Sequence, residues 1–63
     1  MSFRVVWMQG PKAIGSRNFD DLEAATRYAE VEMLTMQKRF GITAVKVIGS
    51  DGRPYFLRTI SRG

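Results

Sequence analysis

The sequence predicts a small α+β domain in which one long helix covers one face of a small antiparallel sheet. Three observations support this class: an apolar segment near the start, a central segment with apolar residues three and four apart, and two later apolar segments around an Asp-Gly turn. The 63 residues form one domain, 1–63, because a second core does not fit in this length. The expected element order is strand, helix, strand, strand.

Residues 3–8, FRVVWM, are predicted to form the first strand because β-branched and aromatic side chains dominate them. Alternate side chains of a strand point to opposite faces. Phe3, Val5 and Trp7 form the larger uncharged set, so we expect them to face the helix. Residues 12–16 follow a Gly-Pro pair that can reverse the chain, which makes them a candidate edge strand; the alternative is a loop.

The helix is predicted between an acidic start and a glycine. Asp20 and Glu23 have the spacing of a capping box, and Gly41 supplies the left-handed residue at which helices often end. Between these ends the apolar residues share one stripe, which we expect to pack on the sheet. The stripe consists of Leu22, Ala25, Ala29, Met33, Met36 and Phe40.

Residues 42–48 and 54–60 are predicted to form two strands around a turn. The third strand, 54–60, is expected to lie centrally, because its apolar residues fall on both faces and it can pair antiparallel with the first strand. A two-residue Asp51-Gly52 loop would turn Phe56 and Arg58 toward the helix, whereas a three-residue loop starting at Ser50 would turn them away. The three-residue loop is favoured because it removes Arg58 from the core face and places Gly52 at the left-handed position. The helix-facing set is then Val45, Val47, Tyr55 and Leu57.

The composition argues against several functions. The sequence has no cysteine and no histidine, so we expect no disulfide, no metal or other cofactor, and no enzyme activity. No segment has the length of a signal sequence or a membrane span, so we expect a cytoplasmic protein. Residues 61–63 are expected to form a frayed tail.

One sheet face remains without a helix to cover it, and we predict that it makes any contact with a partner. This outer face would carry Arg4, Val6, Met8, Lys46, Ile48, Phe56, Arg58 and Ile60. A secondary candidate surface lies on the helix at Tyr28, Val31 and Leu34. The prediction is a non-catalytic interaction module that binds a protein or forms a homodimer. The alternative is nucleic-acid binding, since the net charge is +4 and a sheet can present aromatic and basic side chains to bases and phosphates.

The pattern FRVVW, then FDDLEAATRYAE, then VKVIGSDGRPYFL resembles small bacterial domains of unknown function. Those domains place a Phe/Asp-led, alanine-rich helix after an initial β segment and close with a strand and an Asp-Gly-Arg turn. The resemblance implies an α+β fold. It brings no activity and no site residue.

Overall fold

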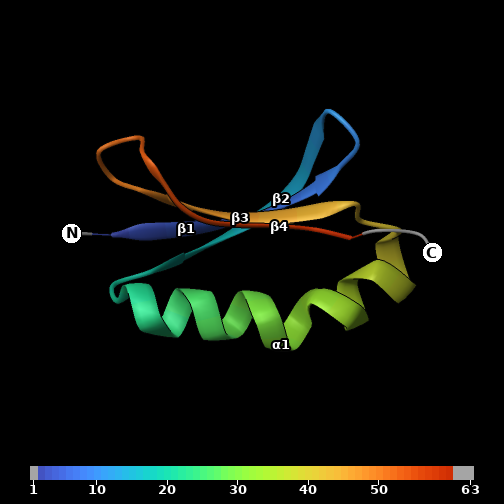
Figure 1. Cartoon of the computed structure of the whole chain (residues 1–63), viewed down its shortest axis with the longest axis horizontal. Helices are drawn as coiled ribbons and strands as arrows, with labels where there is room; N and C mark the ends of the chain where they lie inside the picture. Colours follow the sequence, from blue (N-terminus) through green and yellow to red (C-terminus); the bar gives the residue numbers. More distant parts are fainter. Residues whose placement is uncertain (1, 61–63) are drawn as a thin grey trace.

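The computed structural model describes residues 2–60 and forms one helix and one four-stranded sheet (Figure 1). All neighbouring strands are antiparallel, in the order β2-β1-β3-β4. This arrangement confirms the α+β class. The prediction that the strand at 54–60 lies centrally was wrong: it is at the edge of the sheet, because the strand at 44–49 pairs with the first strand. The elements in chain order are β1 Phe3–Gln9, β2 Lys12–Phe19, α1 Leu22–Phe40, β3 Ala44–Gly49 and β4 Pro54–Thr59. The predicted tail, 61–63, lies outside the described residues.

The expected element order was wrong by one strand, because the candidate at residues 12–16 is a real and longer strand, β2. Gly10, with φ of 62°, lets the chain reverse after β1. The resulting hairpin aligns Phe3 with Phe19, and a bulge between Trp7 and Met8 shifts its register. Gly and polar residues hid this strand from the sequence pattern, since an exposed edge strand needs little apolar surface.

The core lies between α1 and the sheet. Phe3, Val5 and Trp7 are buried there, as predicted. From α1, the small side chains of Ala25 and Ala29 are fully buried, so the helix can approach the sheet closely. The remaining buried core residues are Ile42, Val45 and Val47.

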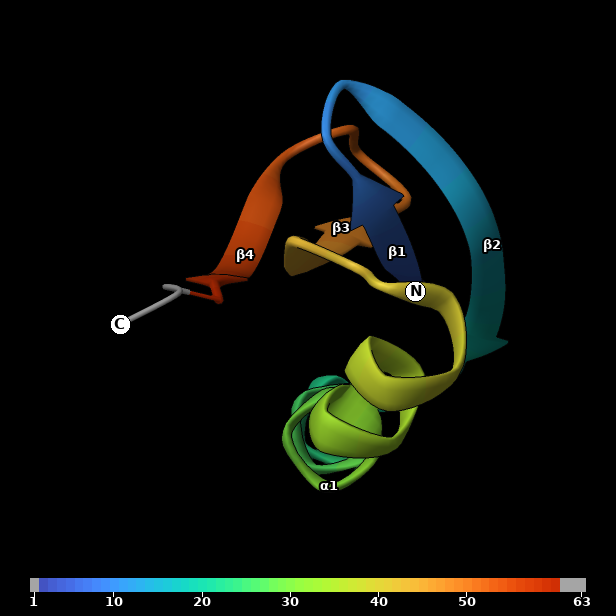
Figure 2. The ribbon, with the colours of Figure 1, turned by 90° about the vertical axis from the view of Figure 1, so that its right-hand side faces the viewer.

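The helix covers only part of the sheet. It packs against β1, β2 and β3, and the view along its axis shows β4 to one side of it (Figure 2). The helix-side face of β4 is therefore largely open to solvent.

Both helix ends are defined by backbone geometry. The N-cap is Asp21, whose carboxylate accepts a hydrogen bond from the Ala24 N–H at 2.9 Å, so the capping box predicted from Asp20 was one residue out of place. Gly41 ends the helix in the left-handed conformation, with φ of 67°, as predicted. Phe40 is 52% exposed, because the chain turns away at the glycine, and it therefore does not join the core as the stripe predicted.

Candidate functional site

The β3–β4 turn has the predicted three residues. The Gly49 N–H donates to the Arg53 carbonyl and the Gly52 N–H donates to the Gly49 carbonyl, both at 2.9 Å. Gly52 takes a left-handed φ of 82°. This is the hydrogen-bond pattern of a type I turn followed by a glycine bulge.

A second bulge nevertheless reverses the predicted faces of β4. Ile48 pairs with Pro54 but Val47 pairs with Phe56, so Tyr55 is an extra residue in β4. One extra residue shifts the register by one and turns every following side chain over. The prediction that Phe56, Arg58 and Ile60 point away from the helix was therefore wrong.

The corrected positions explain how a charged residue shares a face with the core. Phe56 and Ile60 are half-buried and pack against the core cluster, while Arg58, opposite Val45, stays exposed. The Arg58 guanidinium lies 5.5 Å from the centre of the Phe56 ring. Because α1 does not cover β4, Arg58 keeps its contact with water, and the desolvation cost that disfavoured this register does not arise.

Tyr55 and Asp51 hold this bulged end of the hairpin. The Tyr55 hydroxyl donates to Asp51 Oδ2 at 2.8 Å, and the Arg53 N–H donates to Asp51 Oδ1 at 3.0 Å. The Tyr55 ring meets the Phe3 ring edge to face at 5.4 Å. These contacts draw Tyr55 toward the helix-side face of the sheet.

The same contacts shift the pKa values of both side chains. The hydrogen bond from the Arg53 backbone, followed by that from Tyr55, lowers the pKa of Asp51 below 3.8. The hydrogen bond to Asp51 is the main reason that the pKa of Tyr55 rises above 10.0. Asp51 is an exposed residue of the turn and Tyr55 an exposed residue of the bulge in β4, so both shifts result from contacts within the hairpin.

The outer sheet face keeps five of the eight predicted residues: Arg4, Val6, Met8, Lys46 and Ile48. Cross-strand partners share a face, which places Leu57, opposite Lys46, and Thr59, opposite Ala44, where Phe56 and Arg58 were expected. Leu57 was predicted to face the helix but is 63% exposed, whereas Val6, on the same outer face in β1, is only 7% exposed. Without a bulge signal in the apolar pattern, sequence reasoning could not assign Leu57 to this face.

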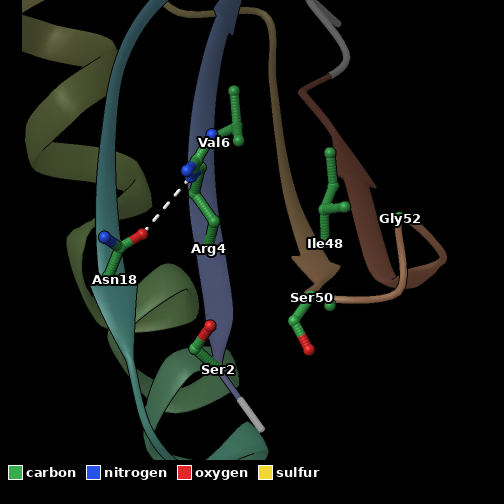
Figure 3. Close-up of a pocket in the computed structure, with 8 residues that line it drawn as sticks. Ser2, Arg4, Val6, Asn18, Ile48, Ser50 and Gly52 are labelled. Carbon is green, nitrogen blue, oxygen red and sulfur yellow. Dashed lines mark hydrogen bonds between the residues drawn. The ribbon is translucent and has the colours of Figure 1, made fainter.

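A hollow of about 360 Å³ lies on the outer face beside Arg4 (Figure 3). Arg4 Nε donates to Asn18 Oδ1 of β2 at 3.3 Å. Ser2 and Ser50 line the same hollow, and the Ser50 N–H donates to the Ser2 carbonyl at 2.9 Å. Asn18, Ser2 and Ser50 were not predicted as site residues, since only the β1–β2 pairing and the β3–β4 turn bring them to Arg4.

Only two of the three residues predicted for the secondary helix surface are exposed. Val31 and Leu34 are 68% and 62% exposed, as a contact surface requires. Tyr28 is half-buried instead, with its ring centre 5.0 Å from that of Phe19 and 6.0 Å from that of Trp7. The prediction that Tyr28 belongs with Val31 and Leu34 was therefore wrong.

Within residues 2–60, no three histidine, cysteine, aspartate or glutamate side chains come together as metal ligands would. The single described helix is not apolar enough along its length to cross a lipid bilayer.

Comparisons with protein-family models, with curated proteins and with solved structures find no match to this chain. The contacts, exposure and charge of the described residues therefore carry the functional argument.

Proposed function

We propose that this protein is a non-catalytic interaction module that self-associates by pairing β4 with β4 of a second copy. The observation that carries the proposal is the contrast between the two sheet edges. β2 is exposed except at the half-buried Phe19, contains a bulge, and carries Lys12 and Arg17, and the bulge and charges discourage edge-to-edge pairing. In β4, Pro54 and the bulge protect only the first half, and the second half exposes Leu57.

The backbone of β4 has hydrogen-bonding groups available for such pairing. The Ile60 N–H donates to the Thr43 carbonyl of the adjacent chain segment at 2.8 Å. Hydrogen-bonding direction alternates along an antiparallel strand. Phe56 and Arg58 therefore bond toward β3, and Leu57 and Thr59 direct their N–H and C=O groups toward the free edge.

A two-fold axis at Leu57 makes this edge self-complementary. Antiparallel pairing would place Leu57 opposite the partner's Leu57, so that two exposed side chains cover each other. Phe56 would then lie opposite the partner's Arg58, a pairing that brings a guanidinium to an aromatic ring. The two arginines would not lie directly opposite each other, which avoids the cost of facing like charges.

The expected association is weak. Stable complexes commonly bury roughly 800 Å² per partner, and a few paired residues supply less than that. We expect a monomer–dimer equilibrium with a Kd on the order of 100 µM, in keeping with such a small interface.

Sedimentation equilibrium from low micromolar to millimolar concentration tests the proposal. Wild-type protein is expected to dimerise as concentration rises, and Leu57→Lys is expected to remain monomeric because a charge enters the paired edge. Val31→Lys is the matched control, since Val31 is equally exposed but lies on α1. A wild-type monomer at every concentration, or loss of the dimer in Val31→Lys but not in Leu57→Lys, would reject pairing through β4.

A further inference from the structure

We infer that the hollow beside Arg4 is an oxyanion site that takes a phosphate group of a nucleic-acid backbone. The site lies mainly between β1, β2 and the β3–β4 turn, so it is separate from the β4 edge. Its central group is the Arg4 guanidinium, which is exposed and oriented by Asn18. A guanidinium has five N–H donors, and the bond to Asn18 engages one of them.

The polar groups around Arg4 suit an oxyanion. Ser2 and Ser50 contribute hydroxyl donors to the same hollow, and the backbone bond between them holds their segments together. Figure 3 shows the Arg4 side chain extending along β1 toward Val6 and joined to Asn18, with Ser2 on the other side of the hollow. A planar guanidinium with N–H donors left over from its bond to Asn18 matches the geometry of phosphate oxygens.

Within residues 2–60, the acidic side chains lie away from this hollow. Of the six acidic residues, five lie on α1 or immediately before it, across the sheet from the hollow. The sixth, Asp51, follows Ser50 of the hollow in sequence, but its carboxylate accepts a hydrogen bond from the Tyr55 hydroxyl. Gly49 pairs with Phe3, so a Cβ added at Gly49 would point to the helix-side face. That Cβ would lie 2.8 Å from Asp51 Oδ1. Asp51 therefore directs its charge toward the other face.

A second cation makes a polymer a better ligand than a free ion. Arg4 pairs with Ile48 of β3, and Lys46 lies two residues from Ile48 on β3, with its side chain on the same outer face. Such diagonal neighbours are about 7–8 Å apart, a distance suited to consecutive phosphates of one strand. Within residues 2–60, the aromatic rings lie on the helix-side face or on α1, so the outer face offers phosphate contacts and no base stacking.

Fluorescence anisotropy with a labelled 12-base-pair duplex, measured from low to moderate salt, tests the inference. With two phosphate contacts, log K is expected to fall against log salt with a slope of about −2. Arg4→Gln is expected to weaken binding at low salt about tenfold and to bring the slope to about −1. Arg39→Gln removes the same charge from the exposed end of α1 and is expected to change Kd less than about twofold.

The inference is overturned by no duplex binding at low salt, by equal losses in Arg4→Gln and Arg39→Gln, or by tighter binding of a single strand through stacking. Inorganic phosphate is the competitor that distinguishes binding of a nucleic-acid phosphate from binding of a free oxyanion. If it displaces the duplex at an equal concentration of phosphate groups, the ligand is a free oxyanion and the nucleic-acid assignment is wrong. Amide chemical-shift changes centred on Ser2, Arg4 and Asn18 during duplex titration would support the location. Changes centred on α1 would reject it.

Discussion

Replacing Gly49 with alanine tests the bulge that decides which way β4 faces. Gly49 is buried and its φ is not positive, so the substitution acts through space rather than through backbone strain. A Cβ at this position would lie 3.1 Å from Tyr55 Cδ2 and 2.8 Å from Asp51 Oδ1, and closer still to Tyr55 Cε2. Carbon atoms prefer separations of about 3.5–4.0 Å, so the tyrosine ring must move by about 1 Å.

The size of the effect follows from two opposing contributions. Adding a methyl group to a close-packed site costs about 1–3 kcal/mol. Replacing glycine by alanine returns about 0.4–1 kcal/mol by restricting the unfolded chain. The free energy of unfolding of Gly49→Ala is therefore expected to fall by about 1–2 kcal/mol, which lowers Tm by roughly 5–15 °C in a domain of this size.

Gly15→Ala provides the matched control in another strand. A Cβ there would meet Trp7 Cδ1 at 3.8 Å, an ordinary contact, so its stability is expected to stay level or rise slightly. Urea unfolding followed by circular dichroism measures both variants. In a Tyr55→Ser background the cost of Gly49→Ala should largely disappear, as a double-mutant cycle would show. Equal stability of Gly49→Ala and Gly15→Ala would refute the placement of Tyr55 over Gly49.

Two further predictions concern the helix cap and the turn. Asp21→Ala is expected to lower the free energy of unfolding by about 1 kcal/mol, because it removes the N-cap hydrogen bond. Asp20→Ala should have little effect. A larger loss from Asp20→Ala than from Asp21→Ala in urea unfolding would contradict the observed cap. The carboxyl of Asp51 has a lowered pKa in the fold, so its stabilising contribution is present above pH 3.8 and is lost as pH falls through the folded pKa. Asp51→Asn should therefore flatten the acid limb of a Tm-against-pH curve below about pH 4, and an unchanged acid limb would argue against the hydrogen bonds that Asp51 accepts from the Arg53 N–H and the Tyr55 hydroxyl.

The corrected face of β4 changes what the outer sheet surface can bind. Phe56 lies on the helix side, so it cannot stack on a base at the outer face. Arg4 and Lys46 remain on the outer face and can contact phosphates. The apolar part of this face is also smaller than the sequence suggests, because Val6 is nearly covered by its neighbours. Leu57 is its most exposed apolar residue, and it lies at the edge where self-pairing is proposed.

The well-predicted elements were those governed by local chemistry. Alternation in β1 identified Phe3, Val5 and Trp7 as core residues, and helical spacing identified Ala25 and Ala29. The left-handed conformations of Gly41 at the helix end and of Gly52 in the β3–β4 turn were also predictable, since glycine adopts positive φ at little cost. For the candidate site, β1 and β3 were assigned to the correct faces because their pairing has no intervening bulge up to Met8.

The amino-acid sequence alone determined the fold class, the core of the first strand, the stop of the helix and the length of the β3–β4 loop. Tertiary structure decided the face of Phe56, Leu57 and Arg58, since parity along β4 depends on an extra residue at Tyr55. That extra residue is held by the Phe3 ring, distant in sequence, and by the Asp51 carboxylate. A pattern read along one strand contains no information about such a contact, and shifting one residue turns over every side chain after it.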